Sequence, residues 1–174
     1  MRPPGARVGP AACAGRGTAV ENGARSRRAR NRSAAPRRAA AVAVRPADPC
    51  PCGTGRTYGA CCGRFHAGSA EAATAEQLMR SRYAAFATRD AAYLLRTWHP
   101  RTRPAALDLD DGMRWTGLEI TGTVQGSAFH ATGTVTFRAH WSAGGETGVM
   151  AEHSRFTRAE GNGAWLYVDG DVRD

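Results

Sequence analysis

Apolar and polar residues alternate along residues 129–141. Phe129 opens a series of seven small or apolar residues at every second position, and Trp141 closes it, with Thr, His or Arg between them. A period of two is typical of an antiparallel strand with one buried face. Three further strands are expected at residues 115–124, 149–158 and 165–168, with glycine-containing turns between the later ones. The second half of the chain therefore predicts a meander of about four antiparallel strands.

Helical periodicity precedes these strands. Thr74, followed by Gln77 three residues later, predicts a helix start with a capping box, and Asp90 predicts the start of a second, shorter helix that ends before Pro100. The apolar stripe of the first helix comprises Leu78, Met79, Tyr83, Phe86 and Ala87. The second helix carries its apolar residues at Ala92, Tyr93, Leu95 and Trp98. Helices followed by an antiparallel meander predict an α+β fold with the helices on one face of the sheet.

Positive charge is concentrated at the start of the chain. Residues 1–45 contain eleven arginines and one acid, Glu21, whereas the rest contains thirteen arginines and fourteen acids. The net charge of +9 therefore belongs to a tail, and the remaining chain has no excess of cations for a nucleic-acid groove. Residues 1–46 are rich in Arg, Ala, Gly and Pro without apolar periodicity, which predicts disorder. No apolar run approaches the roughly 20 residues of a membrane span, and we expect a cytoplasmic protein.

Four cysteines cluster in residues 47–68, apart from the single Cys13 of the tail. Cys50, Cys52, Cys61 and Cys62 fall within thirteen residues. A tight cluster favours metal binding over a disulfide framework, whose bridges spread through the fold. Four thiolates complete the tetrahedral shell of Zn²⁺ and leave no position for a reactive water, so we expect a structural zinc ion. His66 lies close enough in the sequence to replace one of the adjacent cysteines.

The cysteine string resembles a known motif. Cys50-Pro-Cys52-Gly-Thr-Gly, followed by Cys61-Cys62, is similar to the SEC-C motif, the zinc knuckle at the carboxyl end of the translocase motor SecA. Further strings resemble the YchJ-like family, which joins a SEC-C knuckle to a nuclear-transport-factor-2-like domain. They are Leu78-Met-Arg-Ser-Arg-Tyr83, Thr97-Trp-His-Pro100, Glu152-x-Ser-Arg-Phe156 and Trp165-Leu-Tyr-Val-Asp-Gly170. The resemblance implies that residues 69–174 form a cone in which helices pack into a bent antiparallel sheet.

Candidate site residues in the body follow from strand alternation. Met150, Glu152, Ser154 and Phe156 share one strand face, and the two apolar members suggest that it points inward. Glu152 is then either an acid/base group, with His99 as a partner, or a buried carboxylate held by Arg80, Arg82, Trp115 or the backbone. The residues expected to line a pocket are Arg80, Arg82, Tyr83, Trp98, Trp115, Ser154 and Phe156.

Three functions are compatible with these features. The first is an adaptor that uses the zinc knuckle and the cone to bind a protein partner. The second is a small-molecule-binding or hydrolytic protein that uses Glu152 and His99. The third is RNA binding through the arginine-rich tail. The residues do not decide whether the chain is an enzyme, and a homodimer is also open.

Overall fold

The chain folds into three helices followed by four strands. The computed structural model describes residues 42–109 and 112–173. The helices are α1 (Gly63–His66), α2 (Ala75–Thr88) and α3 (Ala91–Arg96). The strands are β1 (Met113–Gln125), β2 (Thr132–Ala143), β3 (Glu146–Arg158) and β4 (Trp165–Arg173). They form one antiparallel sheet in the order β1-β2-β3-β4, so the predicted α+β meander is confirmed.

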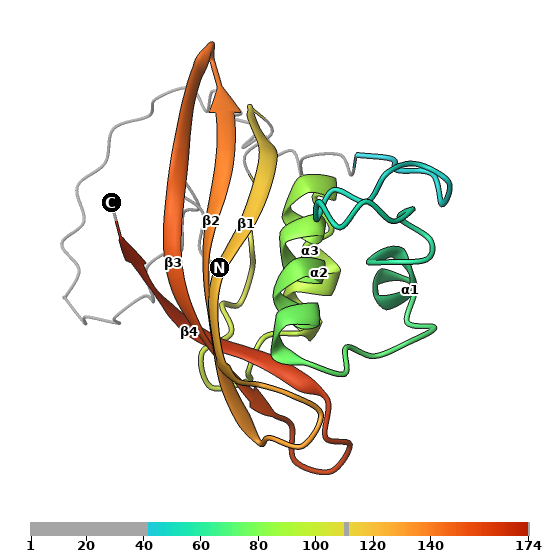
Figure 1. Cartoon of the computed structure of the whole chain (residues 1–174), viewed down its shortest axis with the longest axis vertical. Helices are drawn as coiled ribbons and strands as arrows, with labels where there is room; N and C mark the ends of the chain where they lie inside the picture. The colour runs from blue at the N-terminus through green and yellow to red at the C-terminus, as the bar shows by residue number, and fades with distance from the viewer. Residues whose placement is uncertain (1–41, 110–111, 174) are drawn as a thin grey trace, which may run out of the picture.

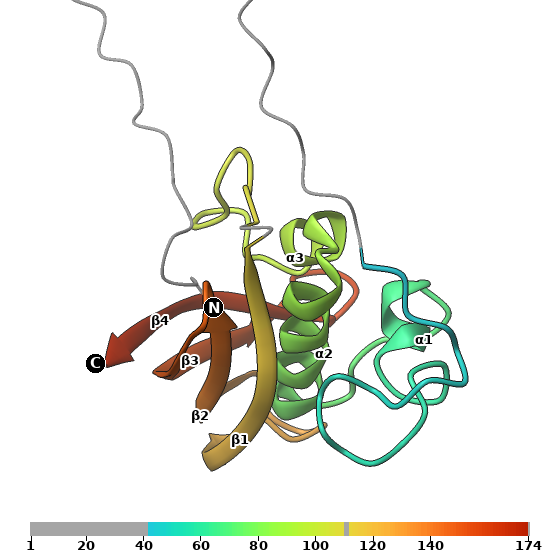
Figure 2. The same ribbon diagram turned by 90° about the horizontal axis from the view of Figure 1, so that it is seen from above.

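The elements lie in three layers. The curved sheet packs its concave face against α2, and α3 packs beside α2 (Figure 1). The cysteine segment and α1 lie on the opposite side of these helices from the sheet (Figure 2). Helix α2 therefore contacts the sheet on one side and the cysteine segment on the other, which makes it the link between the two parts.

Side-chain caps begin the two longer helices as predicted. The Thr74 hydroxyl accepts a hydrogen bond from the Gln77 amide at 3.1 Å, and Asp90 accepts one from the Tyr93 amide at 2.9 Å. Helix α3 spans only six residues, so Trp98, which was expected in it, follows it and is buried there. Within α3, Tyr93 and Leu94 are buried, Leu95 is half-buried and Ala92 is exposed. The apolar stripe of α2 is buried at Leu78, Met79, Tyr83 and Phe86, with Ala87 at its edge.

The alternation in β2 is confirmed in its middle and wrong at its start. Val135, Phe137 and Ala139 are buried as expected, but Phe129 is 97% exposed. Pairing between β1 and β2 begins at Gly133, opposite Gln125, because Gln125 and Gly126 both have positive φ values and turn the chain there. Phe129 therefore lies in the connection between the strands and not on a sheet face.

The described part of the predicted tail contacts the body. The Val42 amide donates to the Thr88 carbonyl, and the Pro46 carbonyl accepts from the Gly59 amide, both at 2.9 Å. Residues 1–41, with Cys13 and most of the segment predicted to be disordered, lie outside the described residues. Among the helices of residues 42–109 and 112–173, none combines the length and apolar character needed to cross a bilayer.

Candidate metal centre and cone interior

Four cysteine side chains converge in the segment before α1. The Sγ atoms of Cys50, Cys52, Cys61 and Cys62 all lie within 4.8 Å of one another, and all four residues are buried. Cys52 and Cys61 have their sulfurs 3.6 Å apart, and Cys61 and Cys62 have theirs 4.0 Å apart. Sulfurs about 2.3 Å from a tetrahedral Zn²⁺ would be separated by about 3.8 Å. The donor set and its spacing therefore fit a metal ion of this kind.

The backbone around the cysteines folds into two turns. Pro49 and Thr57 form a β-bridge. Between these two residues the chain reverses at Gly53 and Gly55, each of which has a φ of 76°. This turn brings Cys50 and Cys52 to one side of the cluster. The amides of Cys61 and Gly63 then donate to the Tyr58 carbonyl at 3.0 and 2.8 Å, which turns the second cysteine pair towards the first. We call residues 47–68 the knuckle.

The thiols of the knuckle perturb one another. A hydrogen bond between Cys50 and Cys52 raises the pKa of Cys50 to about 11 and lowers the pKa of Cys52. Hydrogen bonding to Cys50 and Cys52 also raises the pKa of Cys62. Thr54 adds a hydroxyl 3.5 Å from the Cys52 sulfur and 3.3 Å from the Cys61 sulfur. The thiolate of Cys52 is thus stabilised, while Cys50 and Cys62 are held as thiols. A divalent cation placed among the four sulfurs would stabilise all four as thiolates.

His66 joins the knuckle to α2 and is placed as a structural residue. Its Nε2 lies 2.9 Å from the Ser81 carbonyl, which can only accept, so Nε2 carries the hydrogen and Nδ1 accepts from the Tyr58 hydroxyl at 2.7 Å. The imidazole also packs on the Tyr93 ring, with 4.4 Å between centroids. Burial lowers the pKa of His66. Both ring nitrogens are therefore engaged away from the sulfur cluster.

Two arginines complete the contact between knuckle and helices. Arg96, at the end of α3, donates from Nη2 to the carbonyls of Phe65 and His66 at 2.8 and 2.7 Å. Arg80, on α2, donates to the Cys52 carbonyl at 3.3 Å and pairs with Glu76 at 2.7 Å. Arg80 therefore faces the knuckle, on the opposite side of α2 from the cone interior in which it was expected.

Glu152 lies inside the cone, as strand alternation predicted. It is 1% exposed, and Met150, Ser154 and Phe156 of the same strand face are buried with it. The Ser154 and Tyr167 hydroxyls donate to Glu152 Oε1 at 2.6 and 3.2 Å. Two hydroxyl groups, one from β3 and one from β4, therefore donate to the carboxylate. Sequence reasoning missed Tyr167, although its separation of two residues from Trp165 was a signal for an inward position.

Arg82 supplies the positive charge of this interior. It has no exposed surface, and this burial lowers the pKa of its guanidinium to about 10. Electrostatic interactions with Tyr167, Tyr93 and Glu152 act in the opposite direction and raise the pKa. Its Nη1 donates to the Leu94 carbonyl and the Thr97 hydroxyl, both at 2.8 Å. The guanidinium lies 4.9 Å from the Trp98 ring centroid and 4.4 Å from that of Tyr167. We call Arg82, Trp98, Glu152, Ser154 and Tyr167 the interior cluster.

The other predicted pocket residues lie around this cluster or apart from it. Tyr83 is buried, which raises its pKa to about 12, and its ring meets that of half-buried Trp115 edge-on at 6.0 Å. Phe156 packs edge-on against Tyr167 at 5.8 Å. His99 is half-buried, and its Nδ1 accepts from the Arg101 amide at 3.3 Å within its own turn. Its pairing with Glu152 as acid and base stays a prediction.

Comparisons with known proteins agree with this architecture. Residues 47–64 match the model of the SEC-C motif, and residues 74–170 match that of the YchJ middle nuclear-transport-factor-2-like domain. The chain is 64% identical to a UPF0225 protein of Streptomyces coelicolor over 129 residues, covering 74% of this chain and 99% of the relative. It is 53% identical to a UPF0225 protein of Corynebacterium glutamicum, covering 71% and 96%.

Solved structures show the same fold. A SEC-C motif containing protein from Rhodopseudomonas palustris, solved in solution, is 35% identical with a TM-score of 0.60, covering 72% of this chain and 98% of that one. A SEC-C motif containing protein from Psychrobacter arcticus is 25% identical with a TM-score of 0.59, covering 74% and 85%. The chain therefore belongs to the YchJ-like family, in which a SEC-C motif precedes a nuclear-transport-factor-2-like domain.

Proposed function

We propose that the chain is an adaptor whose knuckle is held by one structural zinc ion and binds a protein partner. The observation that carries this proposal is the convergence of four buried cysteine sulfurs within 4.8 Å of one another. A shell of four thiolates is complete, so the ion would organise the loop and would not activate a substrate. Zinc-dependent folding energy in small zinc modules is on the order of 10–16 kcal/mol, enough to fix a short loop without a core of its own.

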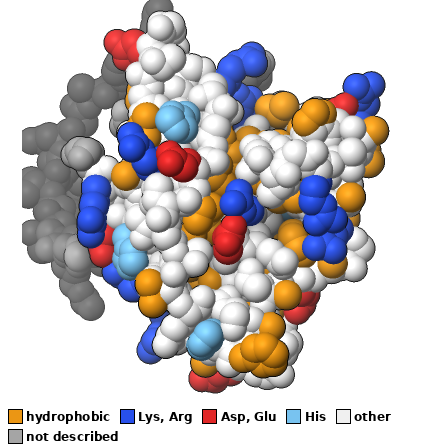
Figure 3. Space-filling model, viewed as in Figure 1, with side chains coloured by type: hydrophobic (Ala, Val, Ile, Leu, Met, Phe, Trp, Pro, Cys, Tyr) orange, Lys and Arg blue, Asp and Glu red, His pale blue; other side chains and the backbone are white. Residues whose placement is uncertain are grey.

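The surface available to a partner is the turn between the two cysteine pairs. Residues 53–57 are all exposed, and Arg56 is the charged residue among them. Arginine side chains are also visible on the side of the molecule that carries α1 (Figure 3). Because His66 and Arg96 dock the knuckle on the helices, this turn would be presented in a fixed orientation, which lowers the entropic cost of binding.

The adaptor role is tested by separating metal binding from partner binding in the full chain. Partner proteins are captured by chemical cross-linking to the wild-type chain and identified by mass spectrometry. The double variant Cys61→Ser/Cys62→Ser should lose both zinc and these partners. Arg56→Glu should keep stoichiometric zinc and lose the same partners, while Cys13→Ser serves as the matched control and loses neither. Retention of the same partners by both Arg56→Glu and the double cysteine variant would contradict the proposal.

The interior cluster favours a second candidate function, the binding of a small polar molecule inside the cone. Arg82 Nε, Arg82 Nη2 and Trp98 Nε1 are buried and have no hydrogen-bond acceptor among the described residues. Leaving such donors unmatched is costly, most of all for a guanidinium. A ligand with a carbonyl or carboxylate oxygen would supply the acceptor. This role would need no hydrolytic step, and hydrolysis by Glu152 and His99 stays a prediction.

Mass spectrometry of the native protein tests the second candidate. The wild-type protein should release a stoichiometric small molecule on denaturation, and Arg82→Lys should lose it because lysine cannot present the same planar set of donors. Arg80→Lys, on the knuckle side of α2, is the control and should retain it. If the wild-type protein carries no such molecule, ordered water is the acceptor for the Arg82 and Trp98 donors, and this function is ruled out. RNA binding through the arginine-rich tail, residues 1–46, stays a prediction, because residues 1–41 of that tail lie outside the described part.

A further inference from the structure

The connection between β1 and β2 presents an aromatic ring to solvent. Phe129 is 97% exposed, more than any other large hydrophobic residue in the described part of the chain. Val124, on the adjoining end of β1, is 64% exposed. Hydrophobic surface is visible at the lower end of the molecule, the end at which the β1–β2 connection lies (Figures 1 and 3). An aromatic ring left in water at this point is a candidate contact for another molecule.

The backbone that carries Phe129 is held in place on both sides. Arg158 donates to the carbonyls of Ala128 at 3.1 Å and His130 at 3.2 Å, the two neighbours of Phe129. The Ser127 hydroxyl lies 2.7 Å from His130 Nδ1 and accepts from the Phe129 amide at 3.3 Å. The ring therefore projects from an ordered turn, and binding it would require little further ordering of the backbone.

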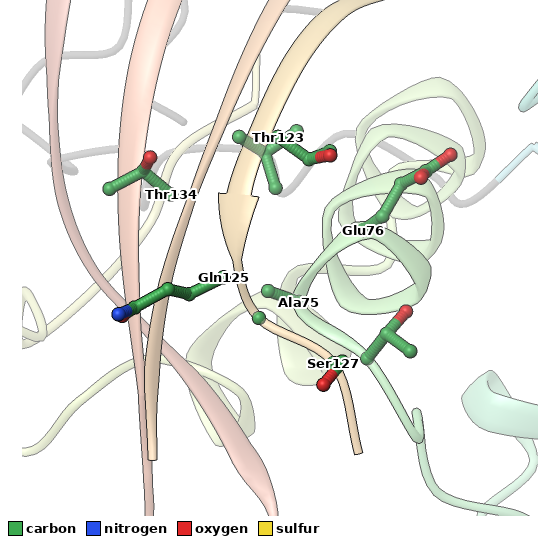
Figure 4. A pocket seen from close by; sticks show the side chains of 9 residues that line it. Ala75, Glu76, Thr123, Gln125, Ser127 and Thr134 are labelled. Carbon is green, nitrogen blue, oxygen red and sulfur yellow. The ribbon is translucent and has the colours of Figure 1, made fainter. Parts of the chain in front are cut away.

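A pocket of about 190 Å³ lies beside this turn. It is formed between the end of β1 and the first turn of α2 (Figure 4). Its lining is mixed: Ala75 and Val135 supply apolar surface, and the threonines supply methyl as well as hydroxyl groups. Glu76, Gln125 and Ser127 add polar groups. An apolar cavity of about 150 Å³ can hold benzene, so the volume is sufficient for a phenyl ring. Ser127 lines the pocket and is two residues from Phe129, so ring and pocket share one end of the molecule.

We propose that two copies of the chain form a two-fold dimer in which Phe129 of each enters this pocket of the other. A two-fold axis would satisfy both ring–pocket contacts at once, because ring and pocket lie at the same end of the molecule. Residues 126–132 contain no Asp, Glu, Lys or Arg, and the guanidinium of Arg158, which reaches this turn, is engaged by the carbonyls of Ala128 and His130. Glu76, the charged residue of the lining, is paired with Arg80 at 2.7 Å. Arg158 is engaged by backbone carbonyls, and residues 126–132 add none of the basic residues that membrane-surface elements carry, which disfavours a membrane as the occupant.

Sedimentation equilibrium of the full chain tests this dimer over concentrations up to about 100 µM, a range that captures weak self-association. The wild-type protein should dimerise, and Phe129→Ser should raise the dimer dissociation constant at least tenfold without a change in thermal unfolding. Thr123→Trp, which fills the pocket and leaves Phe129 in place, should have the same effect. Val172→Ser, at a 47% exposed residue of β4, is the control and should leave the dimer unchanged.

Three results would overturn the proposal. The first is a wild-type protein that is monomeric throughout the concentration range. The second is a dimer that Phe129→Ser does not weaken, or that Val172→Ser weakens more, which would place the interface on the sheet. The third is a monomer that co-sediments with phosphatidylcholine–phosphatidylglycerol vesicles only when Phe129 is present. None of these measurements depends on zinc-dependent partner binding, so the dimer and the adaptor role can fail separately.

Discussion

Gly170→Ala tests the packing of Glu152 inside the cone. A Cβ atom built on Gly170 would lie 2.6 Å from Glu152 Cδ and still closer to Oε1, so the carboxylate would have to move. Moving it breaks the hydrogen bonds from Ser154 and Tyr167. Each hydrogen bond to a charged group contributes about 1.5–3 kcal/mol, or roughly 3–6 kcal/mol for the pair. Replacing glycine in a strand returns about 0.5–1 kcal/mol, which leaves a net loss of about 2–5 kcal/mol.

The assay is urea unfolding of the purified protein in buffer that contains Zn²⁺, with Gly122→Ala as the matched control. A Cβ on Gly122 would have its nearest neighbour at 3.9 Å, an ordinary contact, so this substitution should change the free energy of unfolding by less than about 1 kcal/mol. A double-mutant cycle isolates the clash, because Gly170→Ala should cost almost nothing once Glu152→Ala has removed the carboxylate. Equal costs in both backgrounds, or equal costs at the two glycines, would refute the reasoning.

Three further predictions concern the knuckle and the outer face of the sheet. Arg96→Ala removes two hydrogen bonds to knuckle carbonyls, so hydrogen exchange in residues 47–68 should accelerate while zinc is retained; unchanged exchange would contradict the docking. Gly63→Ala would place a Cβ 2.8 Å from the Tyr58 carbonyl, and competition with a chelator should show at least a tenfold loss of zinc affinity, or the turn is not needed for the site. Hydrogen bonding to Arg155 holds the pKa of Asp171 below its usual 3.8, so this pair stabilises the fold above that pH and loses its effect as the pH falls through the lowered value. An NMR titration should show the midpoint of Asp171 rising in Arg155→Gln; an unmoved midpoint would exclude the pair.

The cysteine cluster and the helix starts were predictable because their determinants are local. The four cysteines are close in sequence, and the turns that bring them together lie between them, at Gly53 and Gly55 and at Tyr58. Thr74 and Asp90 cap helices that begin at the next residue. Such signals depend on the preferences of a few neighbouring residues, and a single sequence carries them in full.

The contacts that dock the knuckle on the helices and hold Glu152 inside the cone were not predictable, because they join segments that are distant in the sequence. His66 reaches Ser81, and Arg96 reaches back about 30 residues to the knuckle. The alternation in β3 indicated that Glu152 faces inward, but its bond to Tyr167 depends on the register of β4, which shifts at a bulge between Arg155 and Phe156. Phe129 was misplaced because an alternating pattern does not mark where strand pairing stops.

Zinc content is the most direct test of the metal-held knuckle. Purified wild-type protein should contain one zinc per chain by inductively coupled plasma mass spectrometry, and Cys61→Ser/Cys62→Ser should contain almost none. Treatment with a strong chelator should remove the hydrogen-exchange protection of residues 47–68 while the sheet stays protected. A wild-type protein without stoichiometric metal, whose knuckle is equally protected with and without the chelator, would contradict the account.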